Sequence, residues 1–584
     1  MCGILGYFSN LKIKDSQLFK LKKAASYLKE RGPDYLGTIN GKNYFLSNSR
    51  LKIVSKKNYI LPLYKHGKYI SFSGEILNHR DLKNFLISKK YKFFTDTDTE
   101  VILSLYDYYG NKFVEYLEGF FSICIYDIKK NLVILTVDRV GNKAIFYNFS
   151  KGKILFSSQQ SYMVRSGFLG FEINKKKIDE SLVFGDVSGE ETLHKNINKL
   201  LPGEILVYNF NKVKKSNYYN LINFVKNIDD QKKQDLNNSI TNIHNVLKLN
   251  IDLWSNNCAY EKSVLLSGGV DSGIISMILS NKSKKLKSFT AKFLGDKDFR
   301  SLNEINEIDD LINKYNIKKN IINCSKSNLL KNINKLYNNF EEPLPSSSLL
   351  LQNLSKSINK NTGTRICFTG DGADEIFGGY SRHHIVNNQY KKDNNLDTIA
   401  LGLNYLSVER LKKFFNKNFQ IPDTRADFLR NLQSTSAINK ILLYDIKYYL
   451  PMFLKSNEVV GMNSSIEFRS PFTDYKLIQE SFMLKDEFKV FKSAGKFILK
   501  KIFANYLKKK FMKKRLFSVP YIAKEFRSGQ FREFLLNLNN NSKISDYYSV
   551  QGIKKLLQDH TRTDHSNTLM RLLTLELFLQ SKTK

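Results

Sequence analysis

The sequence predicts two fold classes in succession: an α+β layered domain, then an α/β domain with a doubly wound parallel sheet and a helical C-terminal part. Three features predict this order. Residues 2–211 carry short β-rich runs with tight turns and a few helical patterns. Residues 238–584 begin with strands that alternate with helices, which is typical of a parallel sheet. Residues 212–237 are polar and rich in Lys and Asn, so we expect a linker there.

The clearest strands of the first domain are residues 121–126 and 132–137, which flank a polar stretch suited to a hairpin loop. Further β-rich runs lie at residues 44–46, 69–72 and 154–156, and helical patterns at 18–29 and 100–109. Because strands and helices mix here without strict alternation, we expect an α+β layered domain.

The second domain opens with a short buried strand at residues 263–266, a glycine-rich turn and an apolar helix at 274–279. The alternation continues with strands at 288–293, 321–324 and 366–368 and helices at 304–315 and 329–340. Ligands of such sheets bind at the carboxyl ends of the strands. Two glycine-rich loops, at residues 267–272 and 369–375, fall at two of those ends.

Composition excludes several classes of protein. The 584 residues exceed one ordinary domain of ~100–200 residues, and 42% hydrophobic and 13% aromatic residues exclude wholesale disorder. No apolar run approaches the ~18 residues that span a bilayer, and the N-terminus lacks the basic start of a secretory signal. Five scattered cysteines argue for a reducing compartment and against a disulfide framework or a zinc site. We therefore expect a cytoplasmic protein without a membrane partner.

The net charge of +37 has two interpretations. A strongly basic chain is typical of nucleic-acid binders. A proteome-wide drift toward Lys and Asn gives the same charge, and the lysines here are scattered along the chain and interleaved with Asn. No basic block adjoins a recognisable RNA- or DNA-binding motif. Drift is therefore the favoured interpretation, and we expect no nucleic-acid partner.

Cys2 is the first candidate catalytic residue. If Met1 is removed, Cys2 carries both a thiol and a free α-amine, and an amine that titrates near ~7.7–8.0 can act as general base for the thiol. A small residue that happens to be second in the chain is the simpler alternative. Further motifs follow in one order across the same domain: Arg31-Gly32-Pro33-Asp34, Arg50-Leu51, Gly74-Glu75 and Thr97-Asp98-Thr99-Glu100.

This ordered set resembles the glutamine amidotransferase domain, of the N-terminal-nucleophile hydrolase type, found in asparagine synthetases. The resemblance implies that Cys2 attacks the side-chain amide of glutamine and releases ammonia. It implies that glutamine is bound along Arg50-Leu51-Lys52-Ile53-Val54, with Arg50 holding its α-carboxylate by a charge-assisted pair. Asp98, with Glu75, would hold its α-ammonium.

Two residues depart from the family's pattern. Ser73-Gly74-Glu75 stands where the family has Asn-Gly-Glu, whose Asn side chain and Gly amide supply the oxyanion hole. Losing one such donor costs ~10²–10³ in rate, and the Ser73 hydroxyl is a shorter and less fixed donor. Ala144 stands where a proline is usual.

The loop Ser267-Gly268-Gly269-Val270-Asp271-Ser272 follows a strand and opens a helix. Converging backbone amides and a helix N-terminus suit an anion, although the loop lacks the Gly-Lys-Ser/Thr ending of a P-loop. A plain strand-helix turn would explain the glycines, but it does not explain an Asp and two serines in the same turn.

The second loop, Thr369-Gly370-Asp371-Gly372-Ala373-Asp374-Glu375, brings three carboxylates to another strand end. Carboxylates beside phosphates need a cation, and Mg²⁺ held by one or two carboxylates and phosphate oxygens is the ordinary solution. A solvated acidic turn is the alternative.

Together the two loops resemble the ATP-pyrophosphatase domain of asparagine synthetases, and the resemblance extends from Ser263 to about Pro520. It implies that Asp371 accepts a proton from attacking ammonia and that Lys514 steadies the phosphate during adenylation of the acceptor. It further implies a pyrophosphate cradle at Ser267, Gly268, Gly269, Asp271 and Ser272, a nucleotide pocket lined by Leu266, Ala291, Thr369 and Gly370, and Mg²⁺ ligands at Asp271, Asp374 and Asp445.

The activity implied by both resemblances is that of a glutamine-hydrolysing asparagine synthetase. ATP would activate aspartate as an acyl-adenylate, and ammonia from the Cys2 site would reach it through an internal tunnel. Three alternatives stay open: amidation of another carboxylate, such as a sugar acid of a surface polysaccharide; an ammonia-dependent enzyme whose glutaminase has decayed at Ser73; and a non-catalytic binding relative. A homodimer is an open possibility for the assembly.

Overall fold

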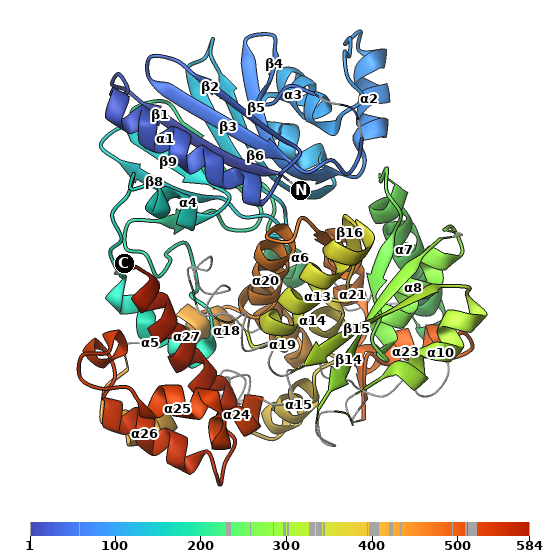
Figure 1. Ribbon diagram of the computed structural model, residues 1–584. Coiled ribbons are helices and arrows are strands. Elements are labelled where there is room, and N and C mark those ends of the chain that lie inside the picture. Colours follow the sequence, from blue (N-terminus) through green and yellow to red (C-terminus); the bar gives the residue numbers. More distant parts are fainter. Residues whose placement is uncertain are drawn as a thin grey trace.

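The computed structural model describes residues 2–55, 57, 59–228, 235–256, 258–283, 285–295, 300, 303–325, 333, 342, 345–393, 395, 408–419, 424–432, 435–492, 494–507, 511 and 522–582. Figure 1 shows two bodies, a sheet-rich N-terminal domain at the top and a larger domain below it that holds the parallel sheet and most of the helices.

Within the described residues, the N-terminal domain contains two six-stranded antiparallel sheets. The first has the order β10 (Asn198–Lys199), β8 (Phe146–Ser150), β9 (Lys153–Ser157), β1 (Gly3–Ser9), β3 (Tyr44–Arg50) and β2 (Tyr35–Asn40). The second has the order β12 (Val213–Asn217), β11 (Glu204–Tyr208), β7 (Leu132–Val137), β6 (Gly119–Asp127), β5 (Lys68–Ile76) and β4 (Leu63–Lys65). The helices are α1 (Asp15–Tyr27), α2 (His79–Ser88), α3 (Asp98–Tyr109), α4 (Gln160–Arg165) and α5 (Lys175–Phe184), with 3₁₀ turns at Leu28–Glu30 and Gly110–Tyr116.

Strand β1 shows why these sheets stack in layers. Its side chains alternate between two faces, and both faces are buried. Ile4 and Phe8 pack into the core between the two sheets, whereas Leu5 and Tyr7 pack toward α1 and α4. On the far side, α2 and α3 cover the second sheet. The resulting order of helix, sheet, sheet and helix confirms the predicted α+β layered domain.

The second domain is built on a parallel sheet of order β15 (Lys318–Ser325), β14 (Lys287–Leu294), β13 (Ser263–Leu265), β16 (Ile366–Phe368) and β17 (Glu467–Arg469). The chain starts in the middle at β13, winds outward through β14 and β15, and then returns to the other side of β13. The strand order therefore reverses between β13 and β16, and ligands of doubly wound sheets bind at such a point. The predicted doubly wound sheet is confirmed.

Helices cover both faces of this sheet and form the C-terminal part. Val264 and Phe368 pack on the side of α7 and α8, while Phe289 and Cys367 pack on the side of α13 and α20. The helices with printed bounds are α6 (Leu221–Lys226), α7 (Leu236–Asn256), α8 (Val270–Ser280), α10 (Ile305–Lys314), α13 (Ser347–Thr362), α14 (Ala373–Phe377), α15 (Ser381–Asp393), α17 (Val408–Phe415), α18 (Thr424–Arg430), α19 (Ala437–Tyr448), α20 (Leu450–Met462), α21 (Tyr475–Met483), α22 (Asp486–Lys489), α23 (Phe497–Phe503), α24 (Ile522–Ser528), α25 (Gln530–Leu536), α26 (Val550–Asp559) and α27 (Ser566–Lys582). Short elements complete the set: β18 (Val490–Phe491), β19 (Ala494–Gly495) and 3₁₀ turns at Pro471–Thr473 and Lys543–Asp546.

The boundary between the domains differs from the expected linker at residues 212–237. Strand β12 pairs with β11 along its whole length, so the second sheet of the first domain continues to Asn217, and α6 follows it. Helix α5, although it belongs to the N-terminal part of the chain, packs against the second domain: Arg571 of α27 donates to the carbonyls of Leu182 (3.0 Å) and Val183 (2.6 Å). The predicted helix at residues 329–340 lies outside the described residues, apart from Ile333.

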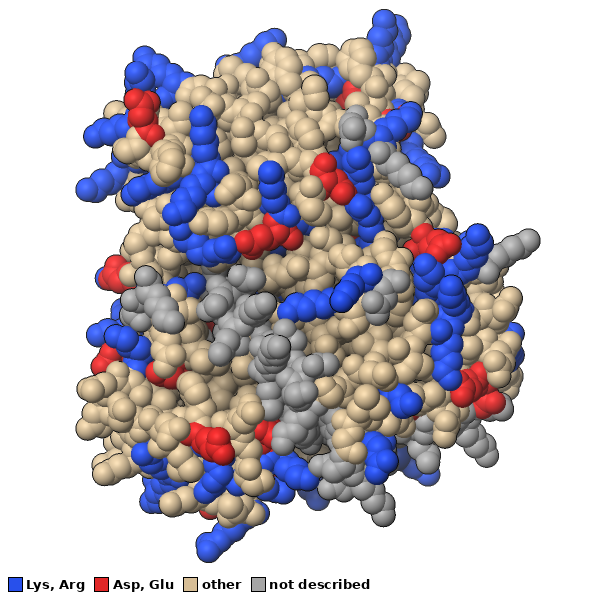
Figure 2. Space-filling model, in the orientation of Figure 1, with Lys and Arg blue, Asp and Glu red and all other residues tan. Residues whose placement is uncertain are grey.

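On the face of the molecule drawn in Figure 2, the charged side chains are dispersed. Figure 2 shows Lys and Arg side chains spread over that whole face, with Asp and Glu among them. Among the described residues, no helix combines the length and the apolar composition needed to cross a bilayer.

Candidate active sites

A pocket opens beside Cys2, at the start of β1. The described residues that line it come from β3, the loop after β3, β4, β5, the start of α3 and the parallel sheet: Cys2, Arg50, Leu51, Ile53, Val54, Ser55, Tyr59, Leu61, Leu63, Phe72, Gly74, Glu75, Thr97, Asp98, Thr99 and Glu467. The structure thus brings together most of the predicted nucleophile and glutamine-binding residues. Lys52 is not among these lining residues; its amide donates to the Asp34 carboxylate (2.7 Å) at the domain boundary.

Two side chains hold Cys2 in place through its backbone carbonyl. Its carbonyl accepts hydrogen bonds from the Ser73 hydroxyl (2.7 Å) and the Arg31 guanidinium (3.3 Å). Burial raises the pKa of the Cys2 thiol above its ordinary value, while the charge of the amino terminus, the Leu51 amide and Arg50 act in the opposite direction. A thiol with a raised pKa needs a base to take its proton, which is the role expected of the α-amine.

Ser73 and Gly74, both expected at the oxyanion hole, have different environments in the structure. The buried Ser73 hydroxyl is bonded to the Cys2 carbonyl, so it positions the residue that carries the nucleophile. Gly74 has φ +138°, and a Cβ there would lie 2.0 Å from the Phe120 carbonyl oxygen, so only glycine fits. Gly74 lines the pocket and remains the candidate for the oxyanion-hole amide.

Arg50 and Asp98 place opposite charges in the same pocket. The Arg50 guanidinium donates to two carbonyls of the loop that follows it (2.7 and 3.1 Å). Asp98 is the first residue of α3, and its carboxylate accepts from the amides of Ile76 (3.2 Å) and Thr99 (2.9 Å). Burial raises the Asp98 pKa, against the effect of these amides and nearby cations. A cation and a carboxylate in one pocket suit the α-carboxylate and α-ammonium of an amino acid.

Glu75 belongs to a buried ion-pair network between the domains. It pairs with Arg469 at the end of β17, and the Arg469 Nε lies 2.7 Å from Glu467. All three side chains are at most 2% exposed. Glu75, expected beside the glutamine ammonium, is therefore already paired with a guanidinium. The Arg469 carbonyl also accepts the Thr369 amide (2.8 Å), so this network reaches the second glycine-rich loop.

The first glycine-rich loop, between β13 and α8, is tied by its serines. The Ser267 and Ser272 hydroxyls lie 3.1 Å apart, and Ser272 also donates to the Ser267 carbonyl (3.0 Å). The Gly268 amide donates to the Glu304 carboxylate (2.8 Å). A carboxylate bound by this amide supports the prediction that the loop attracts an anion.

Lys496 joins the two loops. Its ammonium lies 2.5 Å from Asp271 of the first loop and 2.8 Å from Asp374 of the second. Burial would lower the Lys496 pKa, but the two carboxylates raise it well above its ordinary value. The carboxylates predicted as Mg²⁺ ligands thus converge on one cation position, and hard oxygen donors of this kind fit Mg²⁺. No role for Lys496 was predicted from the sequence, because it lies outside both loops.

Close contact between the loops depends on glycine. A Cβ at Gly370 would lie 2.8 Å from the Asp271 Cβ, and one at Gly379 would lie 1.8 Å from the Asp374 carboxylate. The predicted nucleotide-pocket residues lie on these elements: Leu266 is buried, and the Thr369 hydroxyl is 2.8 Å from that of Ser470. Ala291 lies on β14 and is half-buried.

The other acidic residues of the second loop have different environments. The Asp371 carboxylate accepts from the Asn457 side-chain amide (2.7 Å), which comes from α20. Burial raises the Glu375 pKa to about 8, and Asp374 acts in the same direction. The Tyr380 hydroxyl donates to Glu375 (2.8 Å). Asn457 is a contact that sequence reasoning missed, because nothing in its local sequence marks it.

Asp445, predicted as a further Mg²⁺ ligand, is taken up by protein cations. Its two oxygens accept from the Arg382 guanidinium (2.9 and 2.8 Å), and His383 Nε2 lies 2.6 Å from one of them. A carboxylate with both oxygens bound in this way is not open to a metal, so the geometry argues against Asp445 as a ligand. Lys514, predicted to steady the phosphate, lies outside the described residues.

Two family models match separate parts of the chain. A family model described as asparagine synthase matches residues 260–580, and one described as glutamine amidotransferase domain matches residues 1–219. Asparagine synthetase [glutamine-hydrolyzing] 1 of Bacillus subtilis is 24% identical, covering 99% of this chain and 96% of its own. Asparagine synthetase [glutamine-hydrolyzing] 3 of the same organism is 23% identical, and the match covers 86% of this chain and 84% of that protein. A putative asparagine synthetase [glutamine-hydrolyzing] 2 of Methanocaldococcus jannaschii is 27% identical, and the match covers 66% of this chain and 76% of that protein.

Among solved structures, a glutamine phosphoribosylpyrophosphate amidotransferase from B. subtilis is 11% identical. The match covers 63% of this chain and 81% of that one, with a TM-score of 0.29.

Proposed function

The chain belongs to the asparagine synthase family, and from this premise we propose that it is a glutamine-dependent asparagine synthetase that uses ATP to amidate aspartate. One observation carries the proposal beyond the family name. Strand β17 borders both candidate sites: Glu467 lines the Cys2 pocket, and two residues later the Arg469 carbonyl binds the Thr369 amide of the second loop. Ammonia released at the first site is thereby produced next to the domain that consumes it.

In the glutamine half-reaction, the Cys2 thiol gives its proton to the α-amine and attacks the side-chain carbonyl of glutamine. The Gly74 amide stabilises the oxyanion that forms. The α-ammonium returns this proton to the amide nitrogen, so collapse of the intermediate releases ammonia and leaves a thioester, which water hydrolyses to glutamate. Arg50 and Asp98 hold the two charged ends of the substrate and so fix its amide beside the sulfur.

In the synthetase half-reaction, a carboxylate oxygen of aspartate attacks the α-phosphorus of ATP and pyrophosphate leaves. The amides of the loop from Ser267 to Ser272 face the charge that develops on the leaving group. Asp271 and Asp374 would hold Mg²⁺, which supplies further neutralisation of that charge.

Ammonia then attacks the acyl carbon, Asp371 accepts a proton from the attacking nitrogen, and AMP leaves. The Asn457 side chain holds Asp371 from α20 during this step. Because ammonia is mostly ammonium at neutral pH, direct passage between the sites protects its reactive form. Buried ion pairs keep the domains docked for this purpose, such as Arg31 with Glu458 (2.5 Å).

The test is release of pyrophosphate by the purified protein with Mg-ATP and glutamine, in the presence of aspartate or of a panel of other carboxylates that includes sugar acids. Aspartate-dependent release, with asparagine identified by mass, is the expected result. Release that depends on another carboxylate would keep the chemistry and replace the acceptor. No release with any carboxylate, while glutamine is hydrolysed, would refute the synthetase assignment. Asp371→Asn is the matched control, because it should lose amide formation and keep glutamine hydrolysis.

A further inference from the structure

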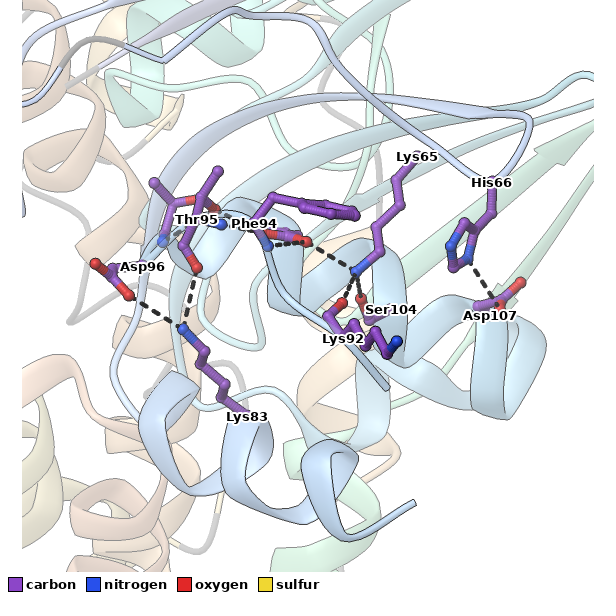
Figure 3. A network of polar contacts seen from close by, with 11 residues as sticks. Lys65, His66, Lys83, Lys92, Phe94, Thr95, Asp96, Ser104 and Asp107 are labelled. Atoms are coloured by element: carbon purple, nitrogen blue, oxygen red, sulfur yellow. Dashed lines mark hydrogen bonds and ion pairs between the residues drawn. The ribbon is translucent and has the colours of Figure 1, made fainter. Parts of the chain in front are cut away.

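We propose that the buried ion pair of Lys65 and Glu100 is a positioning clamp that sets Asp98 for the α-ammonium of glutamine. This inference rests on the proposed glutaminase. The clamp surrounds the segment between α2 and α3, which leads directly into Asp98. Figure 3 shows Lys65 and Lys83 both directed at this segment from different elements.

The Glu100 carboxylate binds backbone amides of this segment. One carboxylate oxygen accepts from the Thr95 amide (2.7 Å) and the Thr95 hydroxyl (2.8 Å), and the Phe94 amide lies 3.1 Å from both oxygens. The Glu100 side chain is 1% exposed. Burial would raise its pKa, but Lys65 and these donors lower the pKa below its ordinary value, so the carboxylate is charged at neutral pH.

Lys65 completes the clamp from the end of β4. Its ammonium donates to Glu100 (2.8 Å), to the Ser104 hydroxyl (3.0 Å) and to the Lys92 carbonyl (2.6 Å). All three ammonium donors are thereby used. Lys83 of α2 binds the same segment from another side, because its ammonium donates to the Thr95 carbonyl (3.0 Å).

The clamp encloses Asp98 in the sequence. Glu100 lies two residues after Asp98 and binds Thr95, three residues before it. The Thr95 hydroxyl is in turn 2.9 Å from that of Thr97. Thr97, Asp98 and Thr99 are consecutive lining residues of the Cys2 pocket. Fixing both sides of this tripeptide fixes the direction of the Asp98 carboxylate, and small misplacements of a binding group are costly to catalysis.

A purely structural role does not need charges at this place. A buried ion pair is often no more stabilising than apolar residues of similar volume, because both charges lose their water. Apart from the pair itself and the Ser104 hydroxyl, the bonds of Lys65 and Glu100 go to the loop: to the amides of Phe94 and Thr95, the Thr95 hydroxyl and the Lys92 carbonyl. The ion pair of Asp107 and Lys68 (2.6 Å) is a control for this role, because Asp107 lies at the other end of α3. Neither Asp107 nor Lys68 is among the described residues that line the Cys2 pocket.

The experiment compares Glu100→Gln, Lys65→Met and the control Asp107→Asn with the unchanged protein. Each is assayed for hydrolysis of glutamine and of glutaramate, which is glutamine without its α-amino group, and for amide synthesis from ammonium chloride. We expect Glu100→Gln and Lys65→Met to raise the KM for glutamine by about tenfold or more and to shrink the preference for glutamine over glutaramate. Synthesis from ammonium and all activities of Asp107→Asn should stay within about twofold.

Thr95→Val is the milder variant if the others fail to fold, since it removes a hydroxyl donor and leaves the ion pair intact. It should shift the same preference in the same direction. An unchanged preference for glutamine in variants that fold would overturn the proposal, and so would an equal loss of ammonium-dependent synthesis, which indicates a general structural role. If the unchanged protein hydrolyses neither amide, the proposed glutaminase fails and the clamp fails with it.

Discussion

Replacement of Arg469 by Met should uncouple the two half-reactions. The guanidinium pairs with Glu75 and Glu467, which are both about 1% exposed, and it also donates to the Trp254 carbonyl. Removing one partner of a buried pair costs about 3–5 kcal/mol, because the other charge stays buried without compensation. Here two carboxylates lose this guanidinium, and one of them, Glu75, lies across the domain boundary, so the folded protein should lose at least that amount of stability.

The same substitution leaves the Arg469 backbone in place. Its carbonyl continues to bind the Thr369 amide, so the second glycine-rich loop should keep its conformation and ammonium-dependent synthesis should persist. The assay measures the amide formed per glutamine hydrolysed, together with the apparent melting temperature. We expect both to fall in Arg469→Met. A triple variant that also carries Glu75→Gln and Glu467→Gln should recover much of the stability, because no charge is left unpaired. An unchanged ratio and melting temperature in Arg469→Met would refute this reasoning.

Three further predictions follow from single contacts. Gly74→Ala should abolish glutamine hydrolysis and spare ammonium-dependent synthesis, because a Cβ would lie 2.0 Å from a backbone oxygen; wild-type rates of both would contradict the strain. Lys496→Met should increase the affinity for Mn²⁺ without ATP, measured by calorimetry, because no ammonium then competes for Asp271 and Asp374; unchanged or weaker binding would count against a shared cation position. Burial raises the Asp445 pKa, but Arg382 and His383 lower it overall, so its stabilisation is present above about pH 4 and is lost as pH falls further. Asp445→Asn should therefore lower the melting temperature near neutral pH and reduce its dependence on pH below 4, and a parallel pH profile would refute the pairing.

The fold was predictable where local pattern decides it. The hairpin of β6 and β7 has a near-continuous apolar run on each side of a polar turn, and the strand-helix alternation from β13 onward specifies a parallel sheet. Strand β12 was missed because it is an edge strand with exposed Lys and Asn side chains, so it lacks the apolar pattern of a buried strand. Its pairing with β11 comes from backbone hydrogen bonds, which cannot be predicted from these side chains.

The candidate sites were predictable in their nucleophile and loops but not in their partners. Cys2, Gly74 and Asp98 meet in one pocket, and Asp271 and Asp374 meet at one cation. By contrast, Glu75 and Arg469 are 394 residues apart in the chain, and no local motif reports a contact over that separation. The same holds for Asp445: the family resemblance implied a metal ligand, but its two oxygens are paired with Arg382 and His383.

The most direct test of the account supplies glutamine labelled with ¹⁵N in its side-chain amide, together with Mg-ATP, aspartate and unlabelled ammonium. Direct transfer of ammonia between the sites predicts ¹⁵N-asparagine with matching AMP and pyrophosphate, and in Cys2→Ala only unlabelled asparagine at an undiminished rate with excess ammonium. Unlabelled product from the unchanged protein, with the label lost to the solution, would contradict direct transfer between the sites. No asparagine and no pyrophosphate from either nitrogen source would contradict the proposed synthetase.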